Sequence, residues 1–102
     1  MSRLLTDEEI TRQLAELDGW SRDGDTIRSV YKATSFARAI EFVHLVAADA
    51  DHMDHHPDIE ISYTTVRWAL STHSEGGITQ LDIELAHRII EAAQQTGAQV
   101  AE

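Results

Sequence analysis

Apolar residues near the start of the chain recur every three or four positions, which is the spacing of one face of a helix. Thr6 and Glu9 stand three residues apart, as in a capping box, where a hydroxyl and a carboxylate satisfy free backbone N–H groups. The apolar positions that follow are Ile10, Leu14 and Leu17. The pattern predicts an amphipathic helix over residues 6–17 that ends at Asp18-Gly19.

From Trp20 the pattern changes towards the two-residue alternation that is typical of strands. Asp23-Gly24-Asp25 supplies a turn between two strands, because glycine adopts turn conformations without steric cost. In the second strand, one face is expected to carry Ile27, Ser29, Tyr31 and Ala33, and the other Arg28, Val30 and Lys32. These residues predict a hairpin.

A longer helix is predicted over residues 35–54, ended by Pro57, and it carries two apolar stripes. The first stripe comprises Phe36, Ile40, Val43, Ala47, Ala50 and Met53, and the second comprises Phe42, Leu45 and Ala48. Because a domain of this size usually covers one face of a helix, we interpret the second stripe as a contact between subunits. The alternative is that Phe42 and Leu45 lie under a loop.

Two further runs, residues 59–63 and 66–72, alternate cleanly and predict strands with one buried face each. The aromatic residues on the buried-face parity are Tyr63 and Trp68. After a loop at Glu75-Gly76-Gly77, the last helix begins at Thr79 and ends near Gly97.

The element order is therefore helix, strand, strand, helix, strand, strand, helix. Adjacent strands joined by short turns pair antiparallel, with helices gathered on one side. We predict a single α+β domain over residues 1–102, with three helices packed on one face of a four-stranded antiparallel sheet.

Composition narrows the function classes. The 102-residue chain has 8 basic and 18 acidic residues, a net charge of −10 that repels phosphate backbones, so nucleic acid is not expected as a partner. No apolar run is long enough to cross a membrane, and the first residues lack the pattern of a secretory signal. Without cysteine, thiolate metal sites and cysteine nucleophiles are excluded. We expect a cytoplasmic protein.

Candidate chemistry is concentrated in residues 51–58, which hold His52, His55 and His56 beside several carboxylates, and at His73 after the last predicted strand. One interpretation is a metal site, with two of these histidines joined by Asp51 or His73, although the spacing matches no familiar zinc motif. A second is that the histidines merely end a helix, where the helix dipole favours cations.

The third interpretation, acid–base catalysis, accounts best for histidines on both segments. Imidazole, with an ordinary pKa of about 6.5, gives and takes protons near neutrality. If the two segments meet, one ring removes a proton from the substrate while another protonates a leaving group. Asp51 or Asp54 would orient a ring and fix its tautomer. No nucleophile-elbow serine or glycine-rich phosphate loop is present, which argues against acyl and phosphoryl transfer.

Two spaced motifs carry a resemblance to a known family. The first is Asp51-x-x-x-His55-His56-Pro57-Asp58, and the second is Tyr63-x-x-Val66-x-x-x-Leu70-x-Thr72-His73-x-x-x-Gly77-x-Thr79-x-x-Asp82. With Leu17-Asp18-Gly19-Trp20 and Phe36-Ala37-Arg38-Ala39, they extend over about residues 14–92. In these motifs the chain resembles the pterin-4a-carbinolamine dehydratase family.

The resemblance implies an α+β fold, a homodimer or homotetramer that we expect to form through the 35–54 helix, and no metal or cofactor. The implied reaction converts 4a-hydroxytetrahydrobiopterin to quinonoid dihydrobiopterin and water, which recycles the pterin of aromatic amino acid hydroxylases. The implied catalytic residues are His55, His56 and His73. We hypothesise that His55 and His73 exchange protons while His56 binds and polarises the substrate. The other implied pterin-binding residues are Asp54, Ser71, Thr72 and Ser74.

Three more positions are candidates for supporting roles by the same resemblance. Asp82 matches a position near the family's active site, but Thr79-x-x-Asp82 is also a capping arrangement. Trp20 would wall a flat pterin pocket or belong to the core. Asp51 stands where family members often carry glutamate. Ile59 departs from the aromatic residue of the animal proteins, which bears on the preferred pterin side chain.

The alternative functions follow from the same observations. Family members also serve in animals as a dimerisation cofactor for a homeodomain transcription factor, so a non-catalytic binding role is the second candidate. A histidine-rich metal-binding protein is the third.

Overall fold

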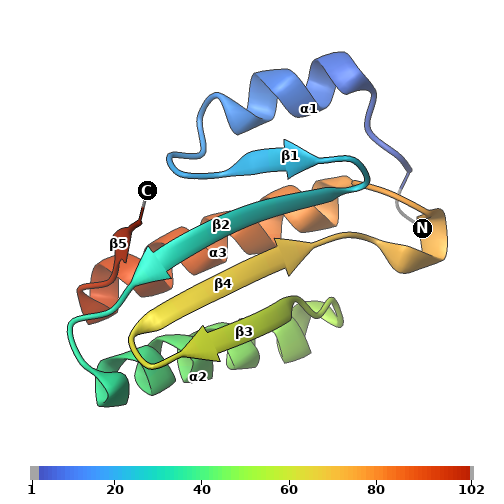
Figure 1. Ribbon diagram of the computed structural model, residues 1–102. Coiled ribbons are helices and arrows are strands. Elements are labelled where there is room, and N and C mark those ends of the chain that lie inside the picture. Colours follow the sequence, from blue (N-terminus) through green and yellow to red (C-terminus); the bar gives the residue numbers. More distant parts are fainter. Residues whose placement is uncertain (1–2, 102) are drawn as a thin grey trace.

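Backbone hydrogen bonding in the computed structural model, which describes residues 3–101, gives three α-helices and one antiparallel sheet (Figure 1). The helices are α1 (Asp7–Leu14), α2 (Phe36–Met53) and α3 (Gln80–Thr96), with a short 3-10 turn η1 (His73–Glu75) before α3. The strands are β1 (Ser21–Asp23), β2 (Thr26–Lys32), β3 (Asp58–Ser62), β4 (Thr65–Leu70) and β5 (Gln99–Val100). The predicted α+β class is confirmed.

The four predicted strands pair in the order β1-β2-β4-β3. A short fifth strand, β5, was not predicted; it pairs with the end of β2 that β1 leaves free, with Val100 opposite Tyr31. Helices α2 and α3 contact each other behind the sheet, and α1 lies beside β1 (Figure 1). No helix within residues 3–101 is long and apolar enough to cross a membrane.

The core lies between the helices and the two central strands. Strand register places the inward-facing residues of β2 and β4 opposite one another: Ile27 and Leu70, Ser29 and Trp68, Tyr31 and Val66. All six are buried, whereas Arg28 and Lys32 are exposed. The predicted division of the β2 residues between two faces is therefore confirmed, although a serine interrupts the apolar face.

The predicted division of α2 into an inward and an outward stripe is wrong at Phe36, Ile40 and Phe42, although Ala50 of the first stripe is buried. Phe42 of the second stripe is 0 % exposed, whereas Phe36 and Ile40 of the first are 52 % and 44 % exposed. Phe42 packs edge-to-face against Tyr31 and Trp68, with ring centroids 5.4 and 5.2 Å away. Edge-to-face aromatic packing adds to the gain from burial, so the helix turns Phe42 inward and leaves Phe36 and Ile40 outside. Phe42 is consequently unavailable as a contact between subunits.

Tyr63 also departs from its predicted place in the core, because it is 73 % exposed. Ser62 pairs with Thr65, so Tyr63 and Thr64 form a two-residue turn between β3 and β4, and the alternation of the strand ends before them. Tyr63 has a φ of 53°, in the left-handed region that turn residues of tight hairpins adopt. Trp68 is buried as predicted.

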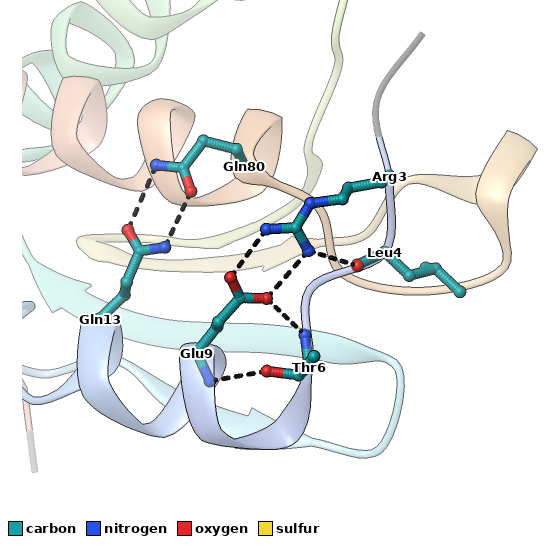
Figure 2. A network of polar contacts seen from close by, with 6 residues as sticks. All are labelled: Arg3, Leu4, Thr6, Glu9, Gln13 and Gln80. Carbon is teal, nitrogen blue, oxygen red and sulfur yellow. Dashed lines mark hydrogen bonds and ion pairs between the residues drawn. The ribbon is translucent and has the colours of Figure 1, made fainter.

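The first turn of α3 is joined to α1, whose own start is fixed by polar contacts (Figure 2). The predicted capping box at Thr6 and Glu9 forms, and Glu9 also accepts two hydrogen bonds from Arg3, of 2.9 and 2.7 Å. Gln13 of α1 and Gln80 of α3 exchange amide hydrogen bonds of 2.8 and 3.2 Å. The Gln13–Gln80 pair supports the first turn of α3, which carries part of the site described next.

Candidate active site

His55 owes its position to the way α2 ends. The helix stops at Met53, and Asp54 adopts a left-handed conformation with φ 52° and ψ 43°. Its turn is held by a 3.0 Å hydrogen bond from the His55 amide to the Ala50 carbonyl. Both histidines before Pro57 lie beyond the helix, in agreement with a helix predicted to end at residue 54. His55 points inward and is 8 % exposed, whereas His56 is exposed.

A buried hydrogen bond between side chains joins His55 to the second segment of interest. His55 Nε2 lies 2.6 Å from Oδ1 of Asp82, which is 0 % exposed. The other oxygen, Oδ2, accepts hydrogen bonds from the Thr72 hydroxyl and the Thr79 amide, both of 2.9 Å. Asp82 therefore connects the end of α2 with the end of β4 and the start of α3.

Both interpretations of Asp82 fit this geometry, because a carboxylate has two oxygens. Oδ2 completes the capping box of α3 with the Thr79 amide, and Oδ1 is left for His55. Thr79 was not among the predicted site residues. Its hydroxyl lies 2.7 Å from the hydroxyl of Thr72, and both residues are buried. The signal in the sequence for Thr79 was the capping motif Thr79-x-x-Asp82, which predicted its role at the start of α3 and not a role in the site.

His73 stands on a tight loop beside the same network. Its neighbour Thr72 pairs with Gly77 across the loop, through hydrogen bonds of 2.8 and 3.3 Å. The loop turns back at Gly76, with a φ of 77°. His73 is exposed and is separated from Asp82 by one residue of chain and one hydrogen bond. The two predicted segments therefore lie together.

The remaining predicted residues take varied positions. Ser71 donates a 2.8 Å hydrogen bond to the Asp25 carbonyl, so it anchors the loop to the turn between β1 and β2. Ser74 and Asp54 are exposed. His56 Nε2 lies 2.9 Å from Asp51 Oδ1 on the surface, as expected if Asp51 orients a histidine.

Trp20 is placed in the core. Its indole N–H donates a 3.2 Å hydrogen bond to the Tyr31 hydroxyl. Tyr31 lies four residues along β2 from Ile27, which pairs with Leu70 near the histidines. Within this chain, Trp20 therefore packs towards the other end of the sheet.

The metal interpretation gains no support from the geometry. Across residues 3–101, no three histidine, aspartate or glutamate side chains are grouped so that they would hold a metal ion. The arrangement instead offers one buried imidazole on a carboxylate, with two exposed imidazoles on the adjoining segments. Such a set is suited to proton transfer.

Comparison with known proteins shows that the part of the chain that carries these site residues matches one family. The family described as "Pterin 4 alpha carbinolamine dehydratase" matches residues 3–92. A protein of Mycobacteroides abscessus is 49% identical over 86 residues, which are 84% of this chain and 92% of that protein. One of Nocardia farcinica is 47% identical over 93 residues, 91% of this chain and 98% of that protein. Both carry the name "Putative pterin-4-alpha-carbinolamine dehydratase".

Two solved structures share the fold. The "transcriptional coactivator/pterin dehydratase" of Brucella melitensis is 36% identical with a TM-score of 0.85, covering 87% of this chain and 97% of that one. A pterin dehydratase-like protein, described as a RuBisCO assembly factor in the alpha-carboxysome, has a TM-score of 0.60 and 20% identity. It covers 72% of this chain and 86% of its own, and it is similar in fold alone.

Proposed function

The chain belongs to the pterin-4a-carbinolamine dehydratase family, and from this premise we propose that it dehydrates 4a-hydroxytetrahydrobiopterin to quinonoid dihydrobiopterin. The observation that carries the proposal is the 2.6 Å contact between His55 and Asp82. It joins the two segments that bear the family motifs, and it gives one histidine a fixed orientation.

In the proposed mechanism, the reaction is an elimination that needs one base and one acid. A proton leaves N5 of the pterin, and the hydroxyl on C4a departs as water once it is protonated. We assign the two proton transfers to His55 and His73, each contributing on the order of 10²–10⁴ in rate. His56, oriented by Asp51 at 2.9 Å, binds and polarises the substrate. No metal or cofactor takes part.

The test is the rate of 4a-carbinolamine decay, followed by ultraviolet absorbance in chelator-treated buffer with and without the protein. His55→Ala and His73→Ala should lower kcat far more than they raise KM. His87→Ala is the matched control, because His87 is an exposed histidine on α3, outside the proposed site. If the wild-type protein leaves the decay rate unchanged, the dehydratase proposal is wrong. Equal losses in kcat and in binding for both variants would overturn the division of roles.

A binding role without catalysis is the second candidate, favoured by the description of the Brucella melitensis structure as a coactivator as well as a dehydratase. A protein that serves only for binding has no need of the Asp82–His55 contact. Its binding should therefore tolerate His55→Ala and His73→Ala, which the dehydratase activity should not.

We also propose that the chain forms a homodimer or homotetramer through α2. The outward residues Phe36 and Ile40 are half-exposed, and β3, an edge strand of the sheet, exposes Ile59 and Ile61 (Figure 1). Exposed apolar side chains that lie together on a surface often mark contacts with other proteins. Phe36→Asp with Ile40→Asp should yield a monomer by light scattering, and an unchanged mass would contradict the assignment. The matched control is Phe36→Leu with Ile40→Leu, which keeps the surface apolar.

A further inference from the structure

The hydrogen bonds around Asp82 have only one consistent direction. Oδ2 accepts from the Thr79 amide, which can only donate, and from the Thr72 hydroxyl. A hydroxyl has one proton to give. Because Thr72 gives its proton to Asp82, the Thr79 hydroxyl must be the donor in the 2.7 Å contact between the two threonines.

The same reasoning assigns the direction of the hydrogen bonds at both ends of this series. The Thr79 oxygen accepts from the Leu81 amide at 3.2 Å, so it is free to give its own proton to Thr72. At the other end, two donors already point at Asp82, and the remaining oxygen faces His55. An ionised carboxylate only accepts hydrogen bonds. An aspartate ordinarily loses its proton far more readily than an imidazolium, so the shared proton belongs on His55 Nε2.

The opposite nitrogen of His55 is then the reactive one. Among residues 3–101, Trp68 Nε1 is the only fully buried side-chain nitrogen or oxygen that lacks a hydrogen-bond partner. His55 Nδ1 also forms no hydrogen bond with the described residues. Since it is not among the fully buried atoms without a partner, it is in contact with solvent. With the proton fixed on Nε2, Nδ1 carries a lone pair at the surface of the site.

We propose that Thr72 and Thr79 are positioning residues: their relay holds Asp82 as a carboxylate, which keeps the neutral His55 ring protonated on Nε2 and presents Nδ1 as the base. This inference rests on the proposed dehydratase, in which Nδ1 takes the proton from N5 of the pterin. The imidazolium that forms lies against the Asp82 carboxylate. His73, the other member of the proton-exchanging pair, then protonates the departing hydroxide. Thr72 thus acts through Asp82, in place of the direct substrate contact that the family resemblance implied.

The first test reads the tautomer of His55 by nitrogen-15 NMR of the substrate-free protein, at a pH where the ring is neutral. In the wild type we expect the proton on Nε2. In Asp82→Asn the amide can donate to Nε2, so the proton should move to Nδ1. A wild-type ring with its proton on Nδ1, or an unchanged tautomer in Asp82→Asn, would overturn the inference.

The second test separates the hydroxyl of Thr72 from its shape. Thr72→Val keeps the size of the side chain and removes the donor, while Thr72→Ser keeps the donor and serves as the control. We expect Thr72→Val to lower kcat by about tenfold, the equivalent of one hydrogen bond to a charged group, with KM changed less than about twofold. Thr72→Ser should retain both the wild-type kcat and the wild-type tautomer.

Folding is checked by thermal unfolding of each variant, so that a loss of structure is not read as a loss of positioning. If Thr72→Val and Thr72→Ser have the same kcat and tautomer, the role of Thr72 is refuted. The NMR measurement needs no turnover. An inactive wild type with its proton on Nε2 would therefore reject the proposed dehydratase while supporting the hydrogen-bond assignment.

Discussion

Alanine substitution of two phenylalanines on α2 tests which face of the helix is buried. Phe42 is 0 % exposed and Phe36 is 52 % exposed, so Phe42→Ala and Phe36→Ala make the same chemical change in opposite environments. Phe42→Ala removes the ring that packs against Tyr31 and Trp68, and should cost about 3–5 kcal/mol. Phe36→Ala should change the free energy of unfolding by less than about 0.5 kcal/mol.

These magnitudes are easily separated by experiment. In a domain of this length, each kcal/mol moves Tm by about 4–8 °C, so Phe42→Ala should lower Tm by at least about 12 °C. Circular dichroism during heating and in urea measures both variants. Because Phe36 lies on the proposed self-association surface, the melts are repeated at several concentrations, since association raises apparent stability. A Phe36→Ala variant that is as unstable as Phe42→Ala when monomeric would refute the assigned orientation of α2.

Three further predictions concern the sheet. Gly19→Ala should cost more than about 1 kcal/mol in thermal unfolding, because Gly19 has a φ of +85° and an added Cβ would lie 2.5 Å from the Val100 methyl groups; a gain in Tm would contradict this. Burial raises the pKa of Tyr31 above its ordinary 10.0. Its contribution to stability is therefore complete below pH 10.0 and is lost as the pH rises through the higher folded-state value, and Tyr31→Phe should reduce that alkaline loss in urea titrations. Trp68→Phe removes an indole N–H that lacks a partner within residues 3–101. Removing this unpaired group should relieve about 1–3 kcal/mol and largely offset the lost packing. Trp68→Phe should therefore lower the free energy of unfolding much less than Phe42→Ala does.

Much of the fold follows from local patterns in the sequence. The capping boxes at Thr6 and Thr79 both form, and the alternation in β2 correctly divides its two faces. The orientation of α2 did not follow, because both of its stripes are apolar. The choice depends on Phe42 meeting Tyr31 and Trp68, residues that are distant in the sequence. Periodicity along one helix contains no information about such partners.

In the candidate site, too, local patterns in the sequence did not reveal which distant residues are in contact. The motifs identified His55 and Asp82 separately, but their contact joins residues 27 positions apart. Parity also misplaced Tyr63, because the hairpin turn begins at this residue, the last one of the alternating run 59–63. The strand β5 was missed because Gln99 and Val100 are too short a run to show alternation, and its pairing depends on the free edge of β2.

Asp82 shows why the site lies at the start of α3. Burying a carboxylate is costly unless donors replace the lost water. At the third position of a helix, the backbone N–H of the capping residue and the positive end of the helix dipole are already in place. The Thr79 amide supplies that donor here, and Thr72 and His55 add two more from neighbouring segments. The arrangement that begins the helix therefore also stabilises the negative charge against which the imidazole is oriented, so the candidate site depends on the capping of α3.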